Sequence, residues 1–370
     1  MNINHRKVSY IAEINLCSKS AYKHQVLKMC DTISELGYDL TLYIISSSHI
    51  PFAEIKKQHL LKKNFKIEPL FKEKKKLNFF LRLIFFIKLF LKKDISSSII
   101  YSRSVLISIF FSLIGRKSYL EIHQINTGLT FYIFNFLKKI IIKKIRFILI
   151  SENLNKHFLL PNNNYLIAED GVDIRDFQIK NNVNLRDKLS CVYTGSLFKG
   201  KGLEFIYSLA KKEKDINFFI YGDIITGDKN LINKCKLIKN LHLKGFVDYN
   251  HIPRILKSHP IILMPYEKKV YGNHRTANLS DYMSPLKMFD YLASGQVIIS
   301  SKNYNINKII KNGYNGIICN NLDIDEWSKK IRSSFKDKNL IKILQKNSYL
   351  TAKRFTWKER VHKILSFINS

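Results

Sequence analysis

Residues 261–300 read IILMPYEKKVYGNHRTANLSDYMSPLKMFDYLASGQVIIS, and they predict a strand, a helix and a second strand in that order. The apolar runs 261–264 and 297–300 have the length of buried strands, while 285–294 has the length and apolar spacing of a helix. Apolar strands that alternate with helices are typical of a parallel sheet wound with crossover helices. This segment therefore predicts a doubly wound α/β fold.

The same alternation runs through the rest of the chain. Further strands are expected at 8–13, 39–46, 98–102, 118–122, 146–150, 190–194, 216–221, 241–244 and 316–318. Further helices are expected at 21–36, 77–93, 104–115, 129–144, 203–212, 229–239, 251–257, 305–312 and 324–335. Turn residues around 170–188 separate two halves of similar size. We expect two Rossmann-like domains, 1–172 and 173–351.

The length and composition suit two ordinary hydrophobic cores. The chain has 370 residues, of which 46% are hydrophobic, and single domains usually have ~100–200 residues. Residues 1–7 are polar and 8–12 suit a buried strand, so no export signal is expected there. The five cysteines are scattered without a CxxC pair, which argues against structural zinc or a disulfide framework. A cytoplasmic protein is expected.

The formal net charge of +33 has two explanations. Lysine, isoleucine, asparagine, phenylalanine and tyrosine are all abundant, and an AT-rich genome alone would give this bias. The alternative is a polyanionic partner, either a nucleic acid or an anionic membrane. Nucleic-acid binders more often show arginine clusters or an aromatic stacking platform. The distribution of the charge therefore favours a membrane, and no nucleic-acid partner is expected.

The segment on which this inference depends is 72–93, KEKKKLNFFLRLIFFIKLFLKK. Its cations interrupt the apolar residues, so a spanning helix is not expected. On a helix they gather on one side, which predicts a helix in the headgroup layer with four basic side chains towards anionic lipid: Lys75, Arg82, Lys88 and Lys92. Residues 140–144 form a second basic and apolar edge in the same half. An ordinary crossover helix with an exposed basic edge is the alternative.

The helix at 285–294 carries the first candidate site. Ser284 is expected to be its N-cap and Pro285 its first residue, so that free N–H groups and the charge of Lys287 could hold an anion. Asp290 follows about one and a half turns later and could accept hydrogen bonds from sugar hydroxyls. A capped structural helix without a ligand fits the same pattern.

The second candidate site is the turn within 192–202, VYTGSLFKGKG. Gly195 and Ser196 follow a strand, and Lys199 and Lys201 precede a helix. Lysines and backbone N–H groups at the carboxyl edge of a parallel sheet lie where doubly wound folds bind nucleotides. The turn is neither a P-loop nor a GxGxxG fingerprint, and a solvated lysine-rich turn is the alternative.

Taken in order, these motifs resemble those of the family 4 retaining glycosyltransferases. Residues 14–44 are similar to the first turn, helix and second strand of that family, and SPLKMFDYLASG at 284–295 is similar to the segment that grips ribose and diphosphate. Further matches are Tyr101-Ser102-Arg103, Leu120-Glu121-Ile122-His123, Ile150-Ser151-Glu152, Glu169-Asp170-Gly171-Val172-Asp173 and Lys244-Gly245-Phe246-Val247. The resemblance covers nearly the whole chain. It implies the GT-B fold, two facing Rossmann-like domains with a C-terminal helix at 352–370 that crosses back to the first.

The resemblance also implies roles for the residues at matching positions. Lys201 would neutralise phosphate charge on the leaving nucleotide, and Asp290 would bind the nucleotide ribose. The other donor-binding positions are Gly195, Ser196, Lys199, Ser284, Leu286 and Lys287, with Gly245 and Val247 beside the base. His123 would face the donor sugar near the reacting centre. The acceptor-side positions are Ser18, Lys19, Arg103 and Glu121.

The chain departs from the family pattern in the residues around the sugar and the phosphates. Tyr282 stands where the first Glu of a Glu-x7-Glu pattern is expected, so that sugar contact must come from elsewhere or be lost. Ser196 stands where an arginine is frequent, which leaves Lys199 or Lys287 as the second phosphate cation.

The expected function is transfer of a sugar, with retention of its anomeric configuration, from a nucleotide-sugar donor to a saccharide acceptor. A lipid-linked acceptor in surface polysaccharide or lipopolysaccharide biosynthesis is expected, at the inner face of the cell membrane. No metal or other cofactor is expected, since the DxD sequence at 323–325 precedes a helix and suits an N-cap. The alternatives are an inverting GT-B transferase, a sugar-nucleotide epimerase, or a non-enzymatic basic module that binds membranes or nucleic acids.

Overall fold

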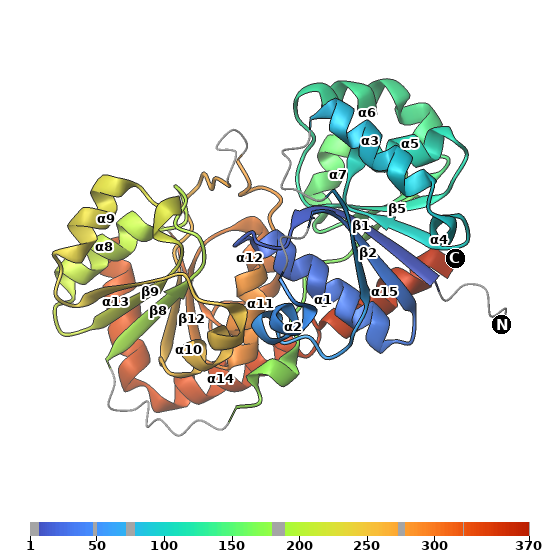
Figure 1. Cartoon of the computed structure of the whole chain (residues 1–370). Helices are drawn as coiled ribbons and strands as arrows, with labels where there is room; N and C mark the ends of the chain where they lie inside the picture. The colour runs from blue at the N-terminus through green and yellow to red at the C-terminus, as the bar shows by residue number, and fades with distance from the viewer. Residues whose placement is uncertain are drawn as a thin grey trace. The chain divides into compact units, whose positions relative to one another are not determined.

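The chain forms two compact units in a computed structural model (Figure 1). The first unit contains Met1–Asp170 and Trp357–Ser370, and the second contains Gly171–Thr356. The sequence placed these boundaries at 172 and 351. The structure describes residues 7–46, 50–71, 78–179, 189–272, 278–320 and 322–369.

The first unit is built on a parallel sheet with seven strands in its described residues, in the order β3-β2-β1-β4-β5-β6-β7. The strands are β1 (Lys7–Asn15), β2 (Asp39–Ser46), β3 (Lys66–Phe71), β4 (Ile99–Ser102), β5 (Ser118–Ile122), β6 (Ile145–Leu149) and β7 (Tyr165–Ile167). The order reverses between β1 and β4, and doubly wound sheets bind ligands outside the carboxyl ends of the strands at such a switch point.

Helices cover both faces of this first sheet (Figure 1). They are α1 (Ala21–Glu35), α2 (Phe52–His59), α3 (Phe79–Phe90), α4 (Lys93–Ser96), α5 (Val105–Leu113), α6 (Gly128–Ile141), α7 (Glu152–Phe158) and α15 (Trp357–Asn369). Helix α5 contacts both α3 and α6, while α1 contacts α2 and α15. The last helix therefore belongs to the first unit, which confirms the predicted return of the C-terminus.

The second unit repeats this topology with a parallel sheet, six-stranded in its described residues, in the order β10-β9-β8-β11-β12-β13. Its strands are β8 (Ser190–Thr194), β9 (Asn217–Tyr221), β10 (Leu241–Gly245), β11 (Ile261–Met264), β12 (Val297–Ser301) and β13 (Ile317–Cys319). Its helices are α8 (Leu203–Lys212), α9 (Lys229–Lys236), α10 (Ile252–Lys257), α11 (Leu286–Ser294), α12 (Tyr304–Ile309), α13 (Ile324–Lys336) and α14 (Lys338–Ala352).

Alternate residues of the second sheet enter two separate cores. Cys191 and Tyr193 of β8 pack under α8 and α13, whereas Val192 packs with α10 and α11 on the other face. This alternation follows from the two-residue period of a strand. Both faces are covered, so the strands are almost continuously apolar, as parallel strands usually are. The expected pair of Rossmann-like parallel-sheet domains is confirmed.

Helix α3 corrects the orientation expected for the basic segment at 72–93. Arg82 forms an ion pair with Glu13 at 2.7 Å, Lys88 donates to the Leu70 carbonyl at 2.7 Å, and Lys92 pairs with Glu68. Arg82 is thus turned towards Glu13 and not towards lipid, whereas Lys88 and Lys92 make these contacts from positions that stay exposed or partly exposed. Lys75 lies outside the described residues. No helix in the described part of the chain combines the length and the apolar character needed to cross a bilayer.

Candidate active site

The basic turn after β8 is held by the neighbouring loop and is not a freely solvated segment. Gly200 and Gly202 have positive φ, and a Cβ on either would lie 2.0–2.2 Å from a backbone oxygen of the loop that follows β11. Glu267 donates its backbone N–H to Gly200, and Tyr271 donates to Lys199, at 3.0 and 3.1 Å. Both glycines are therefore required by this close backbone approach, and the turn has a defined shape.

Helix α11 begins one residue later than the sequence predicted. Pro285 is its N-cap, with extended backbone (φ −75°, ψ 115°), and Leu286 is its first residue, so Ser284 is not the cap. Proline has no side-chain acceptor, so the N-cap residue itself does not bond the first turn. The N–H groups of a helix's first turn and the helix dipole favour an anion at this end. The Tyr291 hydroxyl anchors the helix to the end of β8 through the backbone N and O of Thr194, both at 3.0 Å.

Two half-buried lysines lie near each other at this end of the second sheet. Lys201 Nζ donates to Ser196 Oγ at 2.6 Å, and burial lowers the pKa of Lys201 to about 8. Lys287 Nζ lies 3.8 Å from the ring centroid of Tyr193 and 4.8 Å from that of Tyr266. It has no hydrogen-bond partner among the described residues. Burial, followed by the charge of Lys201, holds the pKa of Lys287 well below its usual value.

Gly195 lies beside this pair of lysines, because a Cβ there would be 3.3 Å from Lys287 Nζ. Leu286, the first residue of α11, precedes Lys287 directly. Five predicted donor-site residues are thus close together: Gly195, Ser196, Lys201, Leu286 and Lys287. Lys199 is in the same turn, but its side chain is exposed. Tyr282 is 2% exposed and belongs to the core, so it does not replace the expected glutamate.

Asp290 belongs to a second group of residues at the end of β10. Its Oδ1 accepts a hydrogen bond from the hydroxyl of Tyr249, the first residue of the turn η5 (Tyr249–His251), at 2.9 Å. Gly245 ends β10 with a positive φ of 76°, and Val247 is half-buried in the loop between Gly245 and this turn. The predicted ribose and base positions are therefore connected by Tyr249, which the sequence did not single out.

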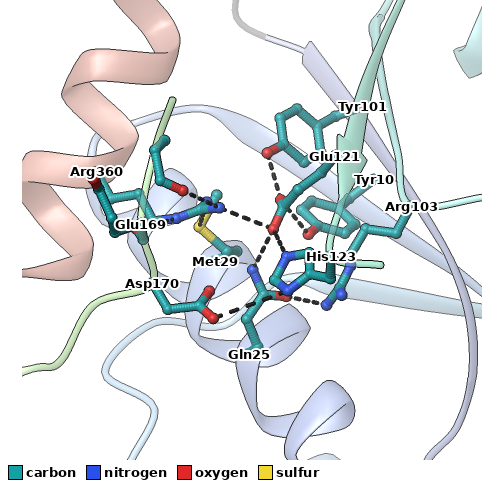
Figure 2. Close-up of polar contacts among 11 residues, drawn as sticks. Tyr10, Gln25, Met29, Tyr101, Arg103, Glu121, His123, Glu169, Asp170 and Arg360 are labelled. Carbon is teal, nitrogen blue, oxygen red and sulfur yellow. Dashed lines mark hydrogen bonds and ion pairs between the residues drawn. The ribbon is translucent and has the colours of Figure 1, made fainter. Parts of the chain in front are cut away.

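In the first unit, the site forms around the buried carboxylate of Glu121 on β5 (Figure 2). Five groups donate to it: the hydroxyls of Tyr10 and Tyr101, Gln25 Nε2 at 2.7 Å, His123 Nε2, and Arg360 Nη2 at 3.0 Å. Burial favours the neutral acid, but Arg360 and His123 outweigh it and hold the pKa of Glu121 well below its usual value. Glu121 is therefore an ionised hydrogen-bond acceptor.

His123 lies between this carboxylate and a second one. Its Nε2 contacts Glu121 Oε1, and its Nδ1 lies 3.9 Å from Asp170 Oδ2. Burial and the charge of Arg103 lower the pKa of His123, so the ring is neutral at pH 7. Arg103 also lies over the ring of Tyr22 at 4.0 Å from its centroid. The structure thus brings together three of the residues that the sequence predicted for the active site: His123, Glu121 and Arg103.

The same cluster does not suit a resident metal ion. Glu121, His123 and Asp170 have ligand atoms within 4.8 Å of one another, which is close enough for a shared cation. However, the two Glu121 oxygens already accept five hydrogen bonds, and the guanidinium of Arg360 touches one of them. A divalent cation would have to displace that charge. The cluster is better described as a hydrogen-bond network around the ionised carboxylate of Glu121.

The remaining predicted positions lie in turns. Ser18 and Lys19 follow β1, where the hydroxyl of Ser18 is 3.0 Å from that of Ser20 and Lys19 is exposed. Asp323 caps α13 by accepting from the Glu326 N–H at 2.9 Å, as the sequence indicated. The sequence missed the roles of Arg360, Asp170 and Gln25, whose separation along the chain gives no local signal.

Comparison with known proteins identifies the second unit. Residues 174–351, nearly all of that unit, match the family described as Glycosyl transferases group 1. The chain is 25% identical over 242 residues to an uncharacterized glycosyltransferase of Methanocaldococcus jannaschii, with 60% of the chain and 58% of that relative covered. The chain thus spans less than two thirds of the length of that relative. The second unit is a group 1 glycosyl transferase domain, which confirms the predicted enzyme class at the level of this domain.

Solved structures confirm the predicted GT-B fold. HepE from Anabaena, in complex with UDP and glucose, has a TM-score of 0.74 at 13% identity over 99% of this chain and 100% of that one. WaaG, a glycosyltransferase involved in lipopolysaccharide biosynthesis, has a TM-score of 0.65 at 10% identity over 97% and 99%. At such identities the likeness establishes the fold.

Proposed function

We propose that the protein is a glycosyltransferase that moves a sugar from a nucleotide-sugar donor to a saccharide acceptor, with retention of configuration. The single observation that carries this proposal is the pair of half-buried lysines, Lys201 in the turn after β8 and Lys287 in the first turn of α11. Burial opposes the charge on both, and no carboxylate is among the causes of either pKa shift. Two such cations favour a ligand that carries at least two negative charges, as a nucleoside diphosphate does.

Breaking the bond to the anomeric carbon leaves negative charge on the diphosphate. Lys201, Lys287 and the N–H groups of α11 can stabilise that charge without reorganising, and one such fixed contact is typically worth ~2.7–4 kcal/mol. Asp290 and Tyr249 are then placed to hold the ribose. The relatives that bind UDP support a uridine donor as the first to test.

The proposed retention is what the resemblance to the family 4 retaining glycosyltransferases implies. In that mechanism the acceptor hydroxyl attacks from the face that the diphosphate leaves, and a phosphate oxygen takes its proton. Glu121 is not proposed as a nucleophile, because its two oxygens accept five hydrogen bonds. His123, which is neutral, orients a sugar hydroxyl and does not act as an acid.

The acceptor is proposed to be lipid-linked, at the inner face of a membrane, as in building a surface polysaccharide. Helices α3 and α6 expose large apolar side chains, among them Phe80 (73%), Phe90 (59%) and Phe136 (87%). Exposed apolar patches of this kind mark interaction surfaces. Lys143 and Lys144, which are exposed just after α6, would lie at the anionic headgroups. The proposed membrane contact therefore combines the exposed apolar side chains of α3 and α6 with the lysines that follow α6.

The test of this function is a screen of nucleotide sugars for release of nucleoside diphosphate by the full chain. UDP-sugars are expected to be hydrolysed slowly without acceptor, and Lys201→Ala and Lys287→Ala are expected to lose about 100-fold each. The anomeric configuration of a transfer product then distinguishes retention from inversion. If no nucleotide sugar is consumed and no nucleoside diphosphate binds, the proposal is wrong.

A further inference from the structure

Arg360 is a buried cation that has no role in the proposed sugar transfer. It is on α15, is 5% exposed, and has four polar contacts. These are with Glu121 Oε1 at 3.0 Å, the carbonyls of Glu169 at 2.8 Å and Ala168 at 3.3 Å, and Met29 Sδ at 3.1 Å. A guanidinium held by four contacts from three segments of the chain has one orientation.

The oxygen that Arg360 contacts also contacts His123. Glu121 Oε1 is shared by Arg360 Nη2, Gln25 Nε2 and His123 Nε2 (Figure 2). Because an ionised carboxylate can only accept, the proton of the neutral ring must be on Nε2. Nδ1 then carries the lone pair, on the side of the ring that faces Asp170 Oδ2 at 3.9 Å.

We propose that Arg360 is a positioning residue for His123, because its contact with Glu121 Oε1 fixes which ring nitrogen of His123 carries the proton. The ring is thereby presented with Nδ1 as a hydrogen-bond acceptor for a sugar hydroxyl. The assignment of the proton stands on the geometry of the first unit alone. The hydrogen bond between Nδ1 and a sugar hydroxyl rests on the proposed function.

Removal of the guanidinium should change the protonation of Glu121. A nearby opposite charge lowers a carboxyl pKa by roughly 1–3 units, and this carboxyl is otherwise buried. The other groups that face Glu121 are the hydroxyls of Tyr10 and Tyr101, the ring of His123, Asp170, and Arg103 acting through Gln25. Once protonated, Glu121 becomes a donor, and the fixed place of the ring proton is lost.

The experiment compares Arg360→Gln with Lys363→Gln, which removes the same charge from the exposed side of the same helix. The first readout is the nitrogen spectrum of the His123 ring in the full chain, assigned with His123→Gln. Wild type and Lys363→Gln are expected to keep the proton on Nε2 from pH 6 to 8. Arg360→Gln is expected to show a mixture of the two tautomers that changes with pH.

The second readout is the pH profile of sugar transfer. In Arg360→Gln, the acid limb is expected to move to higher pH by about 1–3 units, because the ionised Glu121 is then lost earlier as pH falls. Arg360→Lys, which keeps a positive charge, is expected to return the limb towards wild type. A purely structural role for Arg360 would lower the rate equally at all pH values.

A fixed Nε2 proton in folded Arg360→Gln would overturn the proposal, with the circular dichroism and thermal unfolding of the full chain as the check on folding. Because removal of one partner leaves a buried charge, the double variant Glu121→Gln with Arg360→Gln is measured as well. In this double variant the His123 ring is expected to show both tautomers. A ring that keeps its proton on Nε2 alone in the double variant also contradicts the proposal. A wild type that consumes no nucleotide sugar but keeps the fixed tautomer would instead count against the proposed function alone.

Discussion

Arg82 of α3 donates from Nε and Nη2 to the two carboxylate oxygens of Glu13, at 2.7–3.0 Å. This bidentate ion pair determines which side of α3 faces outward. Arg82 and Lys92 are drawn towards Glu13 and Glu68, and the apolar residues divide between the core, as Phe85 and Leu89 do, and the surface, as Phe80, Ile87 and Phe90 do. This orientation changes which residues are expected to bind a membrane.

Substitution of the exposed apolar side chains should weaken membrane binding more than substitution of the basic ones. We expect Phe80→Ser, Ile87→Ser and Phe90→Ser together to reduce binding to anionic vesicles tenfold or more, since each buried large apolar side chain contributes ~1.5–3 kcal/mol. Lys88→Gln should have little effect, because its ammonium group bonds the Leu70 carbonyl. Vesicle co-sedimentation measures both.

The matched control is Ile225→Ser with Leu237→Ser, two residues of the second unit that are 88% and 83% exposed. This pair should leave vesicle binding unchanged. Equal binding by wild type and the α3 triple variant would exclude this surface as the membrane contact.

The alternating pattern predicted most of the fold, and the errors have identifiable causes. Strands such as β8 and β12 were correct because both faces are buried and the sequence is continuously apolar. Strand β3, at the edge of its sheet, has the mixed sequence KIEPLF and was missed, as was the short β7. The orientation of α3 could not be predicted, because Glu13 and Glu68 are far from it in sequence.

The histidine pair between α1 and α2 should make the first unit sensitive to acid. His24 Nδ1 and His59 Nδ1 are 2.9 Å apart, and burial, with the charges of Lys23 and Lys28, lowers the pKa of His59 to about 3. The folded state thus stays neutral while the unfolded histidine takes up a proton below pH ~6.5. Unfolding becomes more favourable as pH falls, by about 2 kcal/mol for His59 between pH 6.5 and 5.

Hydrogen exchange of α1 and α2 at these two pH values measures this loss. His59→Gln should reduce the pH dependence, whereas His362→Gln, which changes an exposed histidine of α15, should not. Protection of α1 and α2 that is equal at pH 6.5 and 5 in wild type would contradict the assignment.

The candidate site was predictable where it is local and not where it depends on distant contacts. Lys201, Lys287 and Asp290 each lie in a motif whose turn or helix end is visible in the sequence. Arg360 is 239 residues from Glu121, and only the folded sheet places them in contact. The buried tyrosines around Lys287 were also missed, because Tyr193 and Tyr266 read as ordinary strand and loop residues.

Binding of UDP should weaken above pH 8 because Lys201 loses its charge. The free enzyme has a Lys201 pKa of about 8, so its charge is complete below that pH and disappears as pH rises through it. A ligand that requires the charged form should bind about tenfold more weakly at pH 9 from this group alone. Lys201→Arg, which stays charged, should make the pH dependence above pH 8 less steep by one proton. Calorimetric titration that finds equal slopes in both proteins would remove Lys201 from the phosphate site.

Binding of UDP at pH 7 should also carry a proton into the site through Lys287. Burial and the charge of Lys201 hold the pKa of Lys287 well below its usual value, so the ammonium form is disfavoured in the free protein. A diphosphate beside Nζ favours the ammonium form, and the lysine then takes a proton from solvent. At pH 7 the phosphates of UDP, with a second pKa near ~6, are already ionised, and Lys201 is mostly charged, so neither contributes much. Calorimetry in buffers of different ionisation enthalpy should therefore show net proton uptake on binding. Lys287→Met should abolish this uptake, and Lys211→Met, at an exposed position on α8, should preserve it.

If wild-type binding takes up no proton, Lys287 is already charged in the free protein, and its place between two tyrosine rings is a cation–π contact that exists before the ligand arrives.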